Sequence, residues 1–288
     1  MSIGQRLRNP LRRAVLLLPH PLRRRLLAAK LHLEERSLAR RIGRAEIDSG
    51  PHDGLAVPPP LLRVRVSGPG AERETWLESG AVDADLIRRL MSRNGIELTT
   101  MDAMLDFGCG CGRVARHWAG LQGPAIHGAD ASGELVRWCQ DHLPFMDAVE
   151  VEALPPSPYP EARFDFVYAL SVLTHLPEDA GFAWVRELVR SLKPGGLLLF
   201  TVHGERLLGV LDEPERARFH AGRLVTRLTE LAGTNSCTAY HPVEYVVADL
   251  LPAVDVELVD AVHEDLTGGR GVLSPMPLQD NYLVRKRA

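Results

Sequence analysis

The chain has 288 residues, of which 45% are hydrophobic and 25% are charged, and its formal net charge at pH 7 is −3. This composition is ordinary for a globular protein, and the length suits one large domain with an appendage or two small domains. No apolar run approaches the roughly 20 residues that a membrane-spanning helix needs, and the apolar run AVLLLPHP is too short for a secretory signal. We therefore expect a soluble, cytoplasmic protein.

The four cysteines, Cys109, Cys111, Cys139 and Cys237, match no common disulfide framework, because the first two are separated by a single residue. We expect a reducing compartment. A metal centre at Cys109 and Cys111 would need two more ligands, and neither Cys139 nor Cys237 lies in a C-x-x-C pair or near a histidine cluster. We therefore expect no metal ion, and we interpret the first two cysteines as small residues that fill a tight space.

Basic residues are concentrated at the amino end. Residues 1–50 contain twelve arginine and lysine residues against four acids, whereas the remaining chain is acidic. Leucines in this segment fall on one broad helical face, namely Leu22, Leu26, Leu27, Leu31, Leu33 and Leu38. We favour a helix whose leucines pack on the main domain and whose arginines face solvent, and the alternative is a peripheral membrane or polyanion contact through residues 1–45. With the linker SGPHDGLAVPPP, this gives a basic helical extension over residues 1–60.

Residues 61–288 are predicted to form one domain, with helical stretches around residues 81–94. From residue 103 onward, short apolar strands alternate with amphipathic helices, which is typical of a parallel sheet covered on both faces. The expected strands are residues 103–107, 125–130, 147–154, 164–171 and 195–203, and the expected helices between them are residues 113–121, 133–143 and 177–192.

The last third of the chain changes character. We expect a charged helical insertion over residues 205–232, a helix at HPVEYVVADLL, and two closing strands at VDVELVDAVHE and NYLVRKR. Residues 205–250 are predicted to form a helical lid over the site.

The stretch MLDFGCGCGR places a carboxylate, Asp106, just before a glycine-rich turn at residues 108–112. In an open α/β sheet, ligands bind outside the carboxyl ends of the strands, where this turn lies. A dinucleotide motif G-x-G-x-x-A is satisfied only from Gly110, two residues late, and Asp106 would repel a pyrophosphate. The same carboxylate would hold an ammonium group well. The residues therefore favour a ligand that carries positive charge.

A second acid, Asp130, ends the next strand, 22 residues after Gly108. A carboxylate at that position can accept hydrogen bonds from both hydroxyls of a ribose. The alternative is that Asp130, ahead of Ser132, merely caps the next helix. Two acids at two strand ends beside one glycine loop favour the nucleoside interpretation.

Four stretches occur together and in order: LDFGCGCGR, GADAS, FDFVYALSVLTHL and LKPGGLLLFTVHG. In this combination residues 76–288 resemble class I methyltransferases that use S-adenosylmethionine. The likeness is greatest to a bacterial branch with SVFTHL after the fourth strand, which is often associated with sugars or secondary metabolites. The resemblance implies a Rossmann-like α/β fold with a seven-stranded, mostly parallel sheet, helices on both faces and the last strand antiparallel beside the fifth.

The resemblance also implies a set of cofactor contacts. Asp106, Gly108, Cys109 and Gly110 would line the methionine end of S-adenosylmethionine, and Asp130 would bind the ribose. The adenine would lie beside Ala131, Glu152 and Ala153, and the Leu170 carbonyl would face the amino group of the ligand. The family usually has Asp or Asn near position 152, where this chain has Glu.

Methyl transfer to a hydroxyl needs alignment of the acceptor and removal of its proton. His175 and His203 follow the fourth and fifth strands on the ligand side, and histidine suits this task because its pKa lies near neutrality. We expect at least one of them to contact the acceptor as a catalytic residue, with His175 favoured. The alternative for His175 is a residue at the entry of the next helix that bonds to the backbone. The alternative for His203 is an exposed loop residue. Tyr168, Ser171 and His241 are candidate substrate contacts, although Tyr168 also suits the core.

The sequence therefore predicts O-methylation of a small molecule with S-adenosylmethionine. One alternative is a protein of the same fold that uses the cofactor for cyclisation or another group transfer. Another is a non-enzymatic binding module that docks through its basic arm. A nucleic-acid acceptor is disfavoured, because the main domain is acidic and few aromatics interleave with its basic residues.

Overall fold

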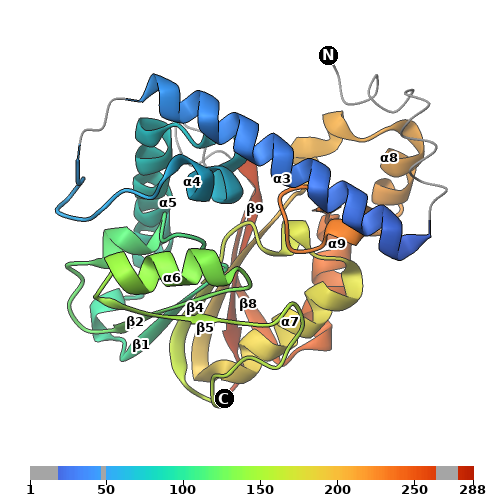
Figure 1. Ribbon diagram of the computed structural model, residues 1–288. Helices are drawn as coiled ribbons and strands as arrows, with labels where there is room; N and C mark the ends of the chain where they lie inside the picture. Colours follow the sequence, from blue (N-terminus) through green and yellow to red (C-terminus); the bar gives the residue numbers. More distant parts are fainter. Residues whose placement is uncertain (1–18, 47–49, 264–277) are drawn as a thin grey trace.

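The computed structural model describes residues 19–46, 50–263 and 278–288. A seven-stranded sheet with helices on both faces forms its centre (Figure 1). In spatial order the strands are β3 (Met146–Glu150), β2 (Ala125–Asp130), β1 (Ala103–Phe107), β4 (Phe164–Ala169), β5 (Leu192–Val202), β9 (Asp280–Lys286) and β8 (Val256–Val262). The first five are parallel, and β9 is antiparallel to both β5 and β8. The predicted Rossmann-like sheet is confirmed, including the antiparallel last strand beside β5.

Both faces of the sheet are buried. On β1, Leu105 and Phe107 join one apolar cluster with Trp184, whereas Met104 points the other way and joins a second cluster with Trp118. This alternation follows from the two-residue period of a strand. Four helices cover the two faces: α7 (Glu178–Ser191) and α9 (Val243–Tyr245) contribute to the first cluster, and α5 (Arg73–Arg93) and α6 (Gly133–His142) to the second.

The amino-terminal segment forms two further helices, α3 (His20–Ala45) and α4 (Pro60–Ser67). Helix α3 begins directly after Pro19, and its Pro21 lies in the first turn, where a missing N–H breaks no helical hydrogen bond. In Figure 1, α3 crosses over α4 and extends toward α8 (Glu213–His220). Within residues 19–46, 50–263 and 278–288, no helix has the length and apolar character needed to span a membrane.

Several predicted segments differ from the structure. The strand expected at residues 147–154 ends at Glu150, and the helix expected at HPVEYVVADLL consists of α9 followed by a π-helical turn at Val246–Leu250. Residues 113–121 contain only a short 3-10 turn, η3 (Ala115–Trp118), because glycines at 112 and 120 leave too short a segment for a stable α-helix. Residues 205–232 are only partly helical. Besides α8 they include β6 (Val225–Arg227), which pairs with β7 (Thr238–Tyr240) in a small antiparallel sheet. Strands of three residues are too short to show an alternating pattern in the sequence.

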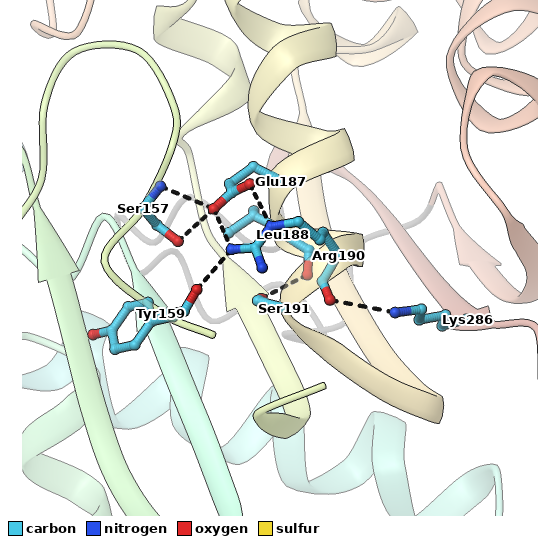
Figure 2. Close-up of polar contacts among 7 residues, drawn as sticks. All are labelled: Ser157, Tyr159, Glu187, Leu188, Arg190, Ser191 and Lys286. Carbon is cyan, nitrogen blue, oxygen red and sulfur yellow. Dashed lines mark hydrogen bonds and ion pairs between the residues drawn. The ribbon is translucent and has the colours of Figure 1, made fainter. Parts of the chain in front are cut away.

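A partly buried polar network ties the segment between β3 and β4 to α7 (Figure 2). The Glu187 carboxylate accepts hydrogen bonds from the backbone N–H (2.9 Å) and hydroxyl (2.6 Å) of Ser157. It also accepts from the Arg190 guanidinium (2.7 and 2.8 Å), which in turn donates to the Tyr159 carbonyl (2.7 Å). The hydrogen bonds from Arg190 lower the pKa of Glu187 to about 2, against the opposing effect of burial. Lys286 of β9 extends the network by donating to the Arg190 carbonyl (3.3 Å).

We expect Glu187→Ala to lower the free energy of unfolding by about 3 kcal/mol at pH 7, because Arg190 and Ser157 lose their shared acceptor. Urea unfolding of both proteins measures the difference. A carboxyl with a lowered pKa stabilises the fold above its unfolded-state pKa, and this stabilisation is lost on protonation. The difference should therefore hold from pH 7 down to about 4.5 and shrink as the pH falls toward 2. Glu78→Ala on the exposed side of α5 is the control, and an equal loss there would contradict the assignment.

Candidate active site

The glycine loop at residues 108–112 joins the end of β1 to η3 and is fixed to the end of β2. The N–H groups of Gly108 and Cys109 both donate to the Ala129 carbonyl (2.7 and 3.1 Å). Gly108 (φ +79°) and Gly110 (φ +56°) have left-handed backbone conformations that favour glycine. A Cβ at these positions would lie 2.4 Å from Cγ2 of Val172 and 2.6 Å from Cγ2 of Val66, respectively. The loop is therefore closely packed as well as specifically bent.

Asp130 holds this loop in place. One of its carboxylate oxygens accepts from the Gly110 N–H (2.9 Å), and the other accepts from the Ser132 N–H (2.8 Å). Burial raises its pKa, while these two hydrogen bonds act in the opposite direction. A carboxylate has about four acceptor positions, so each oxygen keeps one for a ligand. Asp130 thus connects β2, the glycine loop and the start of α6.

Asp106 lies beneath the loop and is buried. The Tyr168 hydroxyl donates to its carboxylate, and Trp118 Nε1 donates to the same hydroxyl (2.8 Å). Burial raises the pKa of Asp106 to about 7, although Tyr168 and the charge of Arg113 lower it in part. Tyr168 itself has no exposed surface, so the structure places it behind Asp106, with its ring in the core.

The residues expected at the adenine lie at the same edge of the sheet. Ala131, Glu152 and Ala153 are exposed, and Trp184 Nε1 donates to the Ala153 carbonyl (3.1 Å). Sequence analysis did not single out Glu150, which lies opposite Asp130 in the register of β2 and β3. The Glu150 carboxylate occupies the space beside Gly133 at the start of α6. The sequence carries no signal for this, because the strand was expected to run on to residue 154, whereas β3 ends at Glu150.

Three histidines meet at the carboxyl ends of β4 and β5. His175 ends the short turn η4 (Leu173–His175), His203 follows β5, and His241 follows β7. The His175 and His203 rings are perpendicular, with centroids 6.3 Å apart, and the His241 N–H donates to the His203 carbonyl (2.8 Å). No metal-binding group of three or more histidine, cysteine, aspartate or glutamate residues is present in the described part of the chain.

These histidines are held in the neutral form. Burial lowers the pKa of His175, lowers that of His203 to about 4 and lowers that of His241 to about 3. His175 Nδ1 lies 2.7 Å from the Cys237 carbonyl, which can only accept, so Nδ1 carries the proton. The lone pair of His175 is therefore on Nε2, which is the tautomer that a general base requires.

Ser171, which follows Leu170 at the end of β4, has a left-handed backbone (φ +59°). Its N–H donates to Thr201 Oγ1 (2.7 Å), and its hydroxyl accepts from Gln279 Nε2 (3.0 Å). Thr201 in turn donates to Gln279 Oε1 (2.5 Å). Sequence analysis missed Thr201 and Gln279, because only the fold brings them to Ser171. Non-glycine residues with left-handed backbone conformations are uncommon and cluster at active and binding sites.

The amino-terminal helices and residues 229–237 cover this edge. Val66 of α4 packs on Gly110, and Asn235 Nδ2 donates to the carbonyl of the neighbouring Arg65 (2.7 Å). The Gly233 N–H donates to the His175 carbonyl (2.9 Å). Residues 229–237, which contact His175, are thus also hydrogen-bonded to α4, the helix that covers the glycine loop.

Residues 105–200 match the family model described as a methyltransferase domain. A 27-O-demethylrifamycin SV methyltransferase of Amycolatopsis mediterranei is 30% identical over 163 residues, which are 50% of this chain and 55% of that protein. A malonyl-[acyl-carrier protein] O-methyltransferase of Enterobacter lignolyticus is 28% identical over 201 residues, 65% of this chain and 73% of that protein. The chain thus spans about half the length of the first of these relatives.

Among solved structures, an S-adenosylmethionine dependent methyltransferase from Mesorhizobium loti has the same fold, with a TM-score of 0.52 and 16% identity over 69% of this chain and 96% of that one. The matched domain begins at Leu105 of β1 and ends at Phe200 of β5, so it includes the glycine loop, Asp130 and His175. Over this domain the chain is similar in sequence to methyltransferases and has the fold of the Mesorhizobium loti methyltransferase.

Proposed function

We propose that this protein transfers a methyl group from S-adenosylmethionine to a hydroxyl group of a small molecule, such as a sugar or a secondary metabolite. The observation that carries the proposal is the convergence of two buried acids, Asp106 and Asp130, on one glycine loop, at the same sheet edge as the neutral His175. Two relatives support an oxygen acceptor, since one is a 27-O-demethylrifamycin SV methyltransferase and the other a malonyl-[acyl-carrier protein] O-methyltransferase.

The chemistry of the site suits S-adenosylmethionine, which supplies a methyl group already activated on a sulfonium. In our proposal Asp130 accepts from the ribose hydroxyls through its two remaining acceptor positions, and Asp106 attracts the ammonium group. Gly108, Cys109 and Gly110 border the methionine end, with the Leu170 carbonyl opposite its amino group. In this proposal the adenine lies beside three exposed residues at the ends of β2 and β3, namely Ala131, Glu152 and Ala153.

On the acceptor side, His175 Nε2 takes the proton of the attacking hydroxyl, while Nδ1–H stays bonded to the Cys237 carbonyl. His203 and His241, beside it, are neutral and complete the wall of the acceptor site. Ser171 contacts the acceptor from the end of β4. Tyr168 acts from behind, by orienting Asp106.

We expect Asp130→Ala to weaken binding of S-adenosylhomocysteine by about 100-fold or more, because each hydrogen bond from a ribose hydroxyl to a carboxylate contributes about 1.5–3 kcal/mol. Isothermal titration calorimetry measures the affinity, and circular dichroism checks that the fold is kept. Asp141→Ala on the exposed side of α6 is the control and should bind as the wild type does. Unchanged affinity in the Asp130 variant would refute the ribose assignment.

The affinity for S-adenosylhomocysteine should also depend on the charge of Asp106, whose pKa is about 7. This carboxyl is neutral in the free protein below that pH, so attraction for the ammonium group is lost as the pH falls. We expect affinity to decrease from pH 8 to pH 6, by up to about tenfold per unit below 7. The Asp106→Asn variant should bind S-adenosylhomocysteine weakly at both pH 8 and pH 6. A wild-type affinity that stays constant over this range would contradict the role of Asp106.

We expect His175→Ala to lower kcat by about 10²–10⁴-fold while leaving cofactor affinity unchanged, because a positioned base contributes that much to the rate. Because the pKa of His175 is lowered, the acid limb of the wild-type kcat/KM profile for the acceptor, measured at saturating S-adenosylmethionine, should lie below pH 6.5 and disappear in the variant. The product of the reaction should also be identified. S-adenosylhomocysteine indicates methyl transfer, whereas methylthioadenosine indicates another use of the cofactor. Full turnover in both His175→Ala and His203→Ala would show that neither residue is the base.

A further inference from the structure

The inner side of helix α3 packs against the rest of the protein. Leu38, Ala39 and Ile42 pack in a small apolar cluster with Val64 of α4. At the other end of the helix, Arg23 forms an ion pair with Glu230 in the turn η6 (Thr229–Leu231). Helix α3 therefore bridges the two segments that cover the site, as its course in Figure 1 shows.

The outer side of α3 carries apolar residues that are exposed to solvent. Leu22, Leu26 and Leu33 are 47%, 45% and 67% exposed. Their spacing of four and seven residues places them in one stripe along the helix, and the exposed Ala29 lies in the same stripe. The expectation that the leucines of this segment pack on the main domain is therefore wrong for these three, which face solvent.

Basic residues flank this stripe. At 100° per residue, Arg25 and Arg36 lie on one side of it and Lys30 and Arg41 on the other. All four are exposed, and of these only Lys30 has an ion-pair partner in the described part of the chain, Glu34 on the same helix. More arginines are exposed along the helix, namely Arg24, Arg40 and Arg44. The sequence before α3 adds four arginines and no acid in residues 1–18.

We propose that the outer face of α3 docks on the surface of an anionic lipid bilayer. The leucines would enter the interfacial layer, and the flanking arginines and lysine would contact lipid phosphates, as in other helices that lie in the membrane plane. The exposed leucines distinguish a bilayer from a nucleic acid, which would engage the arginines alone. The acidic character of the rest of the chain would orient the molecule, because only this end is attracted to a negative surface.

Docking through α3 also determines which part of the molecule approaches the membrane. Helix α3 contacts α4, whose Val66 lies on the glycine loop, and it contacts η6, next to the segment bonded to His175. A bilayer bound to the outer face of α3 would thus lie next to the cover of the site.

Vesicle flotation of the full chain tests this proposal. We expect the wild type to float with vesicles of phosphatidylcholine and phosphatidylglycerol, to remain unbound with phosphatidylcholine alone, and to be released by high salt. Leu22→Ser/Leu26→Ser/Leu33→Ser should reduce the partition coefficient at least about tenfold. Arg25→Glu/Arg36→Glu/Arg40→Glu should reduce the partition coefficient by at least about 100-fold, because each lost arginine costs about fivefold and each added glutamate is repelled by the anionic surface.

The matched control is Arg137→Glu/Arg186→Glu/Arg223→Glu, which makes the same change in net charge at exposed positions outside α3. It should bind anionic vesicles nearly as the wild type does. Three outcomes would overturn the proposal: a wild type that does not float with anionic vesicles, a leucine variant that binds as the wild type does, or an equal loss in the control. The second outcome would indicate a polyanion partner instead.

Discussion

The site depends on one carboxylate, that of Asp130, which receives the N–H groups of both Gly110 and Ser132. These two hydrogen bonds join three elements that the chain builds separately: the end of β2, the loop after β1 and the first turn of α6. The loop needs such a constraint, because its left-handed glycines have many accessible conformations in a free chain. A charged acceptor in a buried setting gives strong and directional bonds, so it fixes the loop at the edge where parallel strands end.

The parallel core and the glycine loop could be predicted from the sequence, because both depend on local signals. Buried parallel strands give short apolar runs, and the run AMLDF before three glycines predicts β1 and the turn after it. The position of Asp130 at the end of β2 followed from the same pattern. The prediction of a helix over residues 113–121 was wrong for a reason that is also local. The segment between Gly112 and Gly120 has a helical composition but too few residues for an α-helix.

The contacts that give the site residues their properties could not be predicted, because they join distant parts of the chain. Nothing in SVLTHL shows that the His175 ring would meet the Cys237 carbonyl, or that Gln279 would bond Ser171. The orientation of Tyr168 depends on register: it lies opposite Asp106 on the neighbouring strand, and both face the α5 and α6 side of the sheet. Strand register is a property of the assembled sheet, and a single strand sequence does not define it.

The contact between Val66 and Gly110 couples the glycine loop to the amino-terminal helices. The methyl group of Val66 already occupies the space that one added carbon on Gly110 would fill, so no ligand atom can reach that side of the loop while α4 keeps its position. A side chain at position 110 would therefore require Val66 to move. Helix α4, which carries Val66, is held in place by α3, because α3 packs against α4 and is tied to Glu230 at its other end.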